Sequence, residues 1–240
     1  MDKKINFNHR LINIAYRDDS DLSVIDEFFV DKMYKSVECL ISNSQFPILD
    51  IGAHIGVFSI YSKIINPKSK IIAIEPGPDN FALLKQNISA NDLSDIKIQQ
   101  TAIIGTEEKT TTLYLSKNSH NHSTIKPSNN LTIQQFNNST ITVPATSLEK
   151  LIKQNKIKKI GLLKMDIEGA EFDIVLNIDN ETWGKIRYVM IEYHESESDK
   201  RENLENIIRQ HGFSVEHFPN KFDKGFGLLV CRNKKVNLND

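Results

Sequence analysis

The residues Phe46-Pro-Ile-Leu-Asp-Ile-Gly-Ala-His-Ile-Gly-Val-Phe-Ser59 carry the clearest structural signal in this chain. An apolar run ends at Asp50, glycines follow at Gly52 and Gly56, and apolar residues then recur at helical spacing. This pattern predicts a buried strand, a tight turn and a helix. Glycine at both positions leaves room for a sharp bend, for a ligand lying against the backbone, and for close approach of the helix to the strand.

The acid at the end of this strand limits the kind of ligand. In nucleotide sites of this shape a pyrophosphate lies against the helix N-terminus, and the Asp50 carboxylate would repel it. The Gly-Lys-Ser/Thr sequence of a phosphate-binding loop does not follow either. A ligand with an ammonium and a sulfonium but no phosphate, such as S-adenosylmethionine, would be attracted. The alternative is a glycine-rich strand-to-helix turn that binds nothing.

A second apolar strand, Lys70-Ile-Ile-Ala-Ile-Glu75, also ends in an acid and is followed by the turn Pro76-Gly-Pro78. Glu75 follows Asp50 at close to the spacing, about 20 residues, at which a strand–helix–strand unit brings an acid to a ribose. We therefore expect Glu75 to bind the two ribose hydroxyls. A solvated glutamate at a strand end is the alternative.

The composition is that of one sizeable globular domain, with or without a modest cap. The 240 residues are 39% hydrophobic and 25% charged, and 30 basic against 31 acidic residues give a net charge of -1. No overall field draws such a chain to nucleic acid or to an anionic membrane. Because the first residues lack the apolar region of a secretion signal, we expect a cytoplasmic protein without nucleic-acid or membrane partners.

Strands and helices alternate along most of the chain. Residues 1–45 are expected to form an N-terminal helical cap or lid with one short strand, and residues 46–235 a single α/β domain. Further strands are expected at 96–104, 110–115, 160–166, 187–193, 213–217 and 227–231. This order predicts a mostly parallel sheet with helices on both faces. The last two strands have no helix between them and should be antiparallel.

The polar stretch 116–140 lacks a clear period and is expected to be a substrate lid or disordered. His120 and His122 have strand-like spacing, but no carboxylate or cysteine lies near them in sequence, so we predict no metal site. His122 is instead expected to contact substrate. Thr101 and Ala102, at the exit of the strand 96–104, are expected to meet an adenine edge.

Charged residues gather where the strand 160–166 ends. Lys164, Asp166, Glu168 and Glu171 all lie in Leu163-Lys-Met-Asp-Ile-Glu-Gly-Ala-Glu171. Three acids and a lysine at one strand end indicate a functional site. The alternative is that the acids stabilise the N-terminus of the following helix through its dipole and that the lysine pairs with a neighbour.

Taken in order, these blocks resemble the FkbM family of S-adenosylmethionine-dependent methyltransferases. The match comprises 49–59, 74–80, 163–171 and the acid-ended Met190-Ile-Glu192. The family usually has asparagine where His54 stands. The resemblance implies a class I methyltransferase fold, a Rossmann-like sheet of seven strands whose carboxyl ends bind the ligand. It implies that Asp50, Gly52 and Gly56 hold the methionine portion of S-adenosylmethionine and that Glu75 holds the ribose. The residues expected to contact this cosubstrate also include Ala53, His54, Pro76, Thr101, Ala102 and Asp166.

The function that the resemblance implies is methyl transfer, which we expect to occur at a hydroxyl of a sugar, glycan or natural product. A hydroxyl acceptor needs a base, and His194 is favoured over Asp166 and Glu168 because its ordinary pKa is nearest neutrality. Lys164 completes the expected catalytic group, and Glu171 is expected to join His122 in binding substrate.

Two alternatives stay open at this point. One is methylation of an amine or carboxylate on a peptide or small metabolite, which needs no strong base. The other is an NAD-binding oxidoreductase or a non-catalytic nucleotide-binding module, which Asp50 and His54 disfavour. The acceptor is expected to be a small molecule, a glycan or a peptide, and a homodimer is left open.

Overall fold

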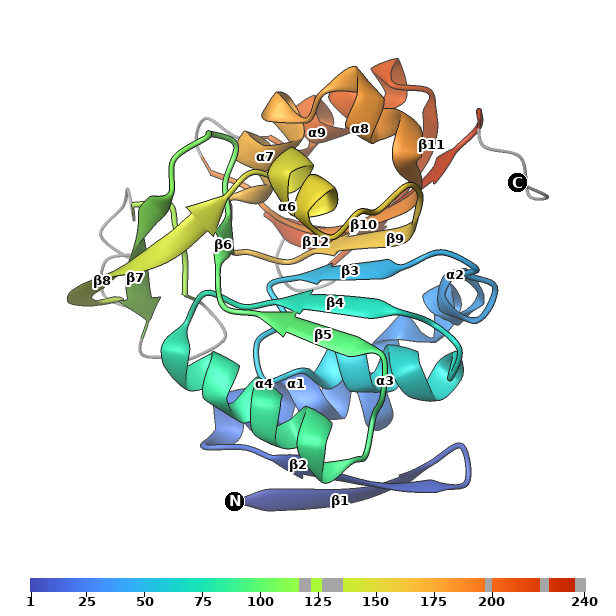
Figure 1. Cartoon of the computed structure of the whole chain (residues 1–240), viewed down its shortest axis with the longest axis vertical. Helices are drawn as coiled ribbons and strands as arrows, with labels where there is room; N and C mark the ends of the chain where they lie inside the picture. The colour runs from blue at the N-terminus through green and yellow to red at the C-terminus, as the bar shows by residue number, and fades with distance from the viewer. Residues whose placement is uncertain (117–121, 127–135, 197–199, 221–224, 236–240) are drawn as a thin grey trace.

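A seven-stranded sheet forms the centre of the protein, in the order β11–β12–β10–β9–β3–β4–β5 (Figure 1). The computed structural model describes all residues except 117–121, 127–135, 197–199, 221–224 and 236–240. The strands are β3 (Ile48–Ile51), β4 (Ile71–Ile74), β5 (Ile96–Gln99), β9 (Ile160–Met165), β10 (Ile186–His194), β11 (Phe213–Pro219) and β12 (Phe226–Asn233). All neighbours are parallel except β12, which is antiparallel to β10 and β11. The predicted sheet and its antiparallel last strand are confirmed.

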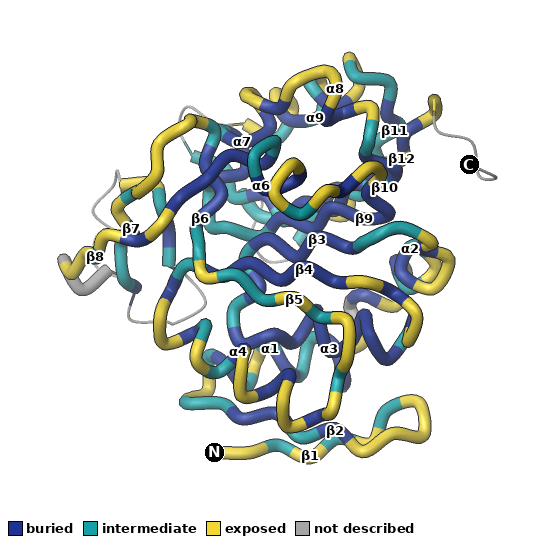
Figure 2. The backbone as a smooth tube through the Cα atoms, viewed as in Figure 1, coloured by how far each residue is buried: buried dark blue, intermediate teal, exposed yellow. Residues whose placement is uncertain are grey.

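Helices cover both faces of this sheet (Figure 1). On one face lie α6 (Leu148–Gln154), α7 (Glu171–Asn177), α8 (Asn180–Lys185) and α9 (Arg201–Gln210), and on the other α1 (Asp19–Phe29), α2 (Glu38–Ser42), α3 (Val57–Ile65) and α4 (Pro78–Ala90). Leu49 and Ile51 pack into the first layer, whereas Ile48 packs into the second. A strand buried on both faces must be apolar throughout, which explains the continuous apolar run before the turn (Figure 2).

The N-terminal segment contains the expected helices, but a β-hairpin precedes them. Strands β1 (Asp2–Phe7) and β2 (Arg10–Ala15) pair antiparallel, and the 3-10 helix η1 (Met33–Val37) separates α1 from α2. Burial alternates along β1, because only one side of the hairpin packs on the domain. On that side Phe7 contacts the rings of Phe29 and Tyr61, at centroid distances of 5.3 and 5.2 Å. A helical cap was therefore too simple an expectation for residues 1–45.

Asparagines of α4 hold the hairpin to the domain. Asn87 is fully buried. Its Oδ1 accepts a hydrogen bond from Ala15 N at 2.7 Å, and its Nδ2 donates to Ala15 O at 3.1 Å and to Ile55 O at 2.9 Å. Asn91 makes the same pair of bonds with the backbone of Asn13, at 2.9 and 2.8 Å. The side-chain amides of Asn87 and Asn91 thus make the hydrogen bonds to the backbone of β2 that a neighbouring strand would make. Asn87 also links β2 to the turn after β3.

A second, three-stranded sheet stands apart from the central one, in the order β6–β8–β7 (Figure 1). Its strands are β6 (Ala102–Ile103), β7 (Thr110–Ser116) and β8 (Phe136–Thr146). The single strand expected at 96–104 is therefore two strands, β5 and β6, in different sheets. Residues 136–140, expected to belong to the polar loop 116–140, lie instead in β8, and the role of the loop as a substrate lid stays a prediction. His120 lies outside the described residues.

Helix starts follow their capping residues. Asp18 caps α1 by accepting hydrogen bonds from the backbone N–H of Ser20 and Asp21, and Ser147 caps α6 by accepting one from Lys150 N. Helix α4 instead begins at Pro78, a residue favoured in the first turn because it has no N–H to leave unpaired. In the part of the chain that the structure describes, no helix is long and apolar enough to cross a membrane.

We predict that Asn87→Ala lowers the free energy of unfolding by about 2–4 kcal/mol, because three hydrogen bonds are lost and the buried backbone groups of Ala15 and Ile55 stay unpaired. Urea denaturation measures the change. Gln86→Ala, at an exposed position on the same helix, is the matched control and should change stability by less than about 0.5 kcal/mol. Equal stability of the two variants would contradict the anchoring role of Asn87.

Candidate active site

Four strand ends meet at one edge of the central sheet. The turn 52–56 follows β3, Glu75 follows β4, Asp166 follows β9, and His194 ends β10. Because β10, β9, β3 and β4 are consecutive, parallel neighbours in the sheet, their carboxyl ends lie side by side. The structure therefore brings together the residues that the sequence placed after separate strands, as ligand sites in parallel α/β sheets require.

Both glycines of the turn are required by packing. Gly52 and Gly56 have φ angles of +77° and +93°, which side chains with a Cβ rarely adopt. A Cβ on Gly52 would lie 1.8 Å from the backbone oxygen of Asp166, and one on Gly56 would lie 2.7 Å from Leu84 Cδ1. The first glycine thus lets the turn touch the end of β9, and the second lets α3 start against α4.

Lys164 and Asp50 form a buried ion pair beneath the turn. They are cross-strand partners on β9 and β3, and Lys164 Nζ lies 3.3 Å from Asp50 Oδ1. Asp50 is fully buried, and its Oδ2 accepts a hydrogen bond from Ser59 Oγ at 2.6 Å. Lys164 Nζ also donates to Gly52 O at 2.7 Å and lies 3.4 Å from Asp166 Oδ2. The ammonium group of Lys164 thus connects β3, the glycine turn after it and the end of β9.

This pair corrects two expectations. Asp50 does not offer a free negative charge to a cationic ligand, because Lys164 already neutralises it; the acid shapes the turn instead. Burial by itself would lower the pKa of Lys164, but Asp50 and Asp166 raise it above the ordinary value of lysine. Lys164 therefore stays protonated and positions its neighbours, and the expected catalytic role does not suit it.

Glu75 connects the two turns that flank β4. Its side chain is nearly buried; Oε2 accepts a hydrogen bond from His54 N at 2.9 Å and Oε1 accepts one from Gly77 N at 2.8 Å. Burial raises the pKa of Glu75, and the charge of His54 and these hydrogen bonds oppose the rise. The carboxylate lies where an acid that binds a ribose is expected, at the strand end next to the glycine turn.

His54 is held by residues of the N-terminal segment. Its Nε2 lies 3.0 Å from Asp21 Oδ1, and Arg17 donates to both oxygens of Asp21, at 2.9 and 3.0 Å. Arg17 Nη2 also donates to Asn80 Oδ1 at 2.6 Å. Burial alone would raise the pKa of Asp21, but hydrogen bonds from His54 and Arg17 outweigh it and hold the pKa well below its ordinary value. Histidine at position 54 therefore ties the glycine turn to α1, a contact the sequence did not reveal.

The loop 166–170, which follows β9, is held by hydrogen bonds to the buried side chain of Glu171. This side chain is fully buried, and it accepts hydrogen bonds from Ile167 N and Gly169 N, both at 2.8 Å. From the other side, Ser123 Oγ donates to Glu168 O at 2.8 Å, and Glu168 has a left-handed φ of 56°. Glu171 was expected to bind substrate, but its burial and its bonds to the loop backbone assign it the shaping of the loop.

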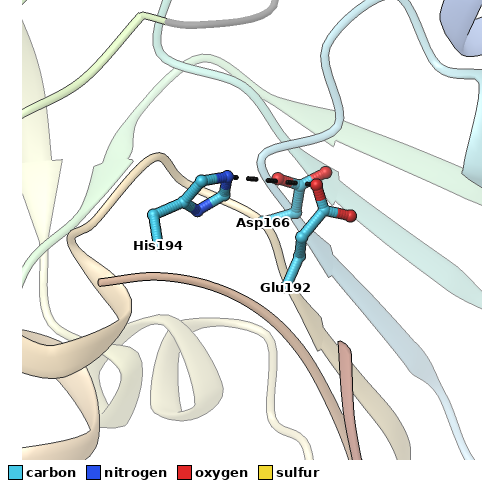
Figure 3. A group of neighbouring side chains, drawn as sticks. All are labelled: Asp166, Glu192 and His194. Carbon is cyan, nitrogen blue, oxygen red and sulfur yellow. Dashed lines mark ion pairs between the residues drawn. The ribbon is translucent and has the colours of Figure 1, made fainter. Parts of the chain in front are cut away.

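His194 faces the carboxyl groups of this loop and of β10 (Figure 3). Its Nε2 lies 3.5 Å from Glu168 Oε2 and 4.0 Å from Glu192 Oε1, and its Nδ1 lies 3.5 Å from Glu171 Oε1. Burial alone would lower the pKa of His194, but Glu168, Glu171 and Asp166 raise it to about 10. This raised pKa removes the reason for favouring His194 as the base, and its catalytic role stays a prediction.

Glu168 is the better candidate for the base. Its burial raises its pKa to about 7, despite the opposing charge of His194. Burial also raises the pKa of Glu192 well above its ordinary value, with Asp166 adding to the effect. A carboxylate that exchanges its proton near neutrality suits general acid–base catalysis.

The remaining predicted residues lie around the same edge. His122 Nδ1 accepts a hydrogen bond from Ser116 N at 3.0 Å, and a Cβ on Gly77 would lie 3.4 Å from His122 Cδ2, so this ring is beside the turn after β4. Thr101 Oγ1 donates a hydrogen bond to Pro144 O at 3.1 Å, and Ala102 of β6 is the strand partner of Ala145 of β8. The expected contacts of His122 with substrate and of Thr101 and Ala102 with adenine stay predictions.

Residues 50–215 match the model of the methyltransferase FkbM domain. This chain belongs to the FkbM methyltransferase family. Methyltransferase sdnD of Sordaria araneosa is 29% identical over 216 residues, covering 80% of this chain and 82% of its own. The 31-O-demethyl-FK506 methyltransferase FkbM of Streptomyces tacrolimicus is 26% identical over 213 residues, covering 79% of this chain and 80% of its own.

The fold of this FkbM-family chain is shared with solved methyltransferases. An O-methyltransferase from Bacillus cereus in complex with SAH superposes with a TM-score of 0.53 at 10% identity, covering 91% of this chain and 92% of that one. The enzyme is an S-adenosylmethionine-dependent methyltransferase, as predicted. Glu75, the acid expected to bind the ribose of this cosubstrate, has its oxygens against the backbone of His54 and Gly77 on the two turns beside it, and its contact with the ribose stays a prediction.

We predict that Lys164→Met lowers the free energy of unfolding by about 3–5 kcal/mol, because it leaves the Asp50 charge buried and unpaired. Urea denaturation measures it. The double variant Asp50→Asn with Lys164→Met should recover much of the loss, because it removes both charges. A double variant no more stable than Lys164→Met would show that the charge pair is not the cause.

Asp21 should make stability depend on acid pH. Its native pKa is depressed, so it stabilises the fold above its unfolded pKa of about 3.9, and this contribution shrinks as the pH falls and the unfolded chain binds the proton. We predict that Asp21→Asn costs about 1–3 kcal/mol at pH 7 and less at pH 3, measured by urea denaturation. A difference that does not depend on pH would exclude this linkage.

Proposed function

We propose that this enzyme methylates a hydroxyl oxygen of a sugar, glycan or natural product. The observation that carries the proposal is Glu168, a carboxyl group with a pKa of about 7 at the edge of the sheet that binds the cosubstrate. A hydroxyl must lose its proton when it is methylated, whereas a carboxylate or a neutral amine needs no strong base. Methylation of either of those acceptors would not require such a group.

The relative from Streptomyces tacrolimicus supports an oxygen acceptor. Its name states that it acts on 31-O-demethyl-FK506, so that protein methylates an oxygen of a natural product. The match to it covers 79% of this chain. This similarity supports oxygen as the acceptor atom. Which molecule carries that oxygen is determined by the residues of this chain.

Different residues of the chain serve the cosubstrate and the acceptor. S-adenosylmethionine supplies the electrophilic methyl group, and the turn 52–54 with Glu75 would hold it. Glu168 accepts the proton of the acceptor hydroxyl at its carboxylate oxygen. Glu171 accepts hydrogen bonds from the backbone N–H groups of Ile167 and Gly169, on both sides of Glu168. These bonds fix the position of Glu168 at the edge of the sheet. Much of the rate is expected from such positioning, which can contribute several kcal/mol.

The test is methyl transfer from labelled S-adenosylmethionine to a panel of glycosides and polyketide alcohols, with amines and carboxylic acids beside them. The expected product is a methyl ether, which survives mild alkali, whereas a methyl ester does not. Label found only in amines or in alkali-labile esters would contradict hydroxyl methylation.

We predict that Glu168→Gln lowers kcat about 10²–10⁴-fold and leaves the dissociation constant of S-adenosylhomocysteine within about threefold, because the amide cannot accept the proton. Steady-state kinetics and calorimetry measure the two quantities. Glu216→Gln, on the exposed side of β11, is the matched control and should keep both values. Wild-type turnover in Glu168→Gln would exclude Glu168 as the base.

A further inference from the structure

Asp166, Glu192 and His194 are arranged like the ligands of a metal ion. Each offers one ligand atom, and these atoms all lie within 4.8 Å of one another. Ligand atoms at about 2.1 Å from one ion are separated by about 3 Å when adjacent and about 4.2 Å when opposite. Figure 3 shows the His194 ring directed at the two carboxyl groups. Small side-chain movements would therefore bring all three into coordination distance.

The backbone presents these three groups together. Glu192 and His194 are two residues apart on β10, so their side chains leave the same face of the strand. Asp166 follows the last residue of β9, which is the parallel neighbour of β10. The three ligand atoms thus come from two adjacent strand ends, and none depends on a long loop.

Each of the three side chains also has a partner behind it. Tyr34 donates to Glu192 Oε2 at 3.1 Å, Lys164 Nζ lies 3.4 Å from Asp166 Oδ2, and Glu171 Oε1 lies 3.5 Å from His194 Nδ1. These contacts leave Glu192 Oε1 and His194 Nε2 facing one another at 4.0 Å. A histidine ligand usually has a carboxylate or carbonyl on its other nitrogen, which is the place of Glu171 here.

The charge around the three groups is also suited to a cation. Glu27 interacts electrostatically with Asp166 and with Glu192, and Glu168 lies beside His194. Lys164, whose Nζ lies 3.4 Å from Asp166 Oδ2, is already shared with Asp50. A divalent cation among these carboxylates would reduce their mutual repulsion.

We propose that Asp166, Glu192 and His194 bind one divalent first-row metal ion, of which Mn²⁺ is representative. Two carboxylates favour Mg²⁺ and Mn²⁺, while the imidazole favours transition metals, so their combination points to an ion such as Mn²⁺. Three protein ligands leave positions open for other oxygens. The ion would hold the acceptor hydroxyl oxygen and make its proton more acidic, a role that rests on the proposed function, whereas binding of the ion does not.

The test is titration of the full chain, freed of metal with EDTA, with MnCl₂, followed by calorimetry and by the electron paramagnetic resonance signal of free Mn²⁺. One ion per chain is expected to bind. Glu192→Gln keeps an oxygen for Tyr34 and should weaken Mn²⁺ binding at least tenfold, and Asp166→Asn should do the same if the first variant does not fold. Glu216→Gln is the matched control and should bind Mn²⁺ like the wild type.

Calorimetry with S-adenosylhomocysteine on the same samples distinguishes failure of the metal-site proposal from failure of the proposed function. Wild-type protein that binds S-adenosylhomocysteine but no Mn²⁺ would overturn the metal site and leave the methyltransferase untouched. Mn²⁺ binding that is unchanged in both Glu192→Gln and Asp166→Asn would overturn the choice of ligands. Hydroxyl methylation at full rate in EDTA would overturn the role of the ion in holding the acceptor.

Discussion

The buried ion pair of Lys164 and Asp50 is the constraint on which the active edge of this enzyme depends. Parallel pairing of β3 and β9 places the two residues opposite one another, and burial makes each charge costly without the other. Because the same ammonium binds Gly52 O, the pair also fixes the start of the glycine turn. Gly52 then touches the backbone of Asp166, so one contact sets the glycine turn against the loop after β9.

Two further groups of contacts support this edge of the sheet, one from the N-terminal segment and one from the core. The N-terminal segment reaches it through His54 and Asp21, which link the glycine turn to α1. Glu171 supports the loop after β9 from within the core. The acidic side chains at this edge can therefore lie close together, because buried partners hold them in place. Burial raises the pKa of Glu168, and the neighbouring charges of Asp166 and Glu171 add to the rise. The same packing places Asp166, Glu192 and His194 in one group.

The features that strand order determines could be predicted from the sequence. Apolar runs ending in Asp50, Glu75 and Asp166 indicate parallel strands, and the carboxyl ends of parallel strands meet at one edge. The partners of those acids could not be predicted, because Lys164 neutralises Asp50 across strands more than 100 residues apart in sequence. The raised pKa of His194 depends likewise on carboxylates from another strand end. Strand β1 was missed because only one of its sides is buried, so it lacks a continuous apolar run.

A crystal structure of the enzyme with S-adenosylhomocysteine and Mn²⁺, with the ion located by its anomalous signal, tests this arrangement most directly. The ribose hydroxyls should lie within hydrogen-bonding distance of Glu75, the sulfur beside the turn 52–54, and the anomalous peak among Asp166, Glu192 and His194. Density for the nucleoside away from Glu75 and this turn would contradict the assignment of the edge as the methyl-transfer site.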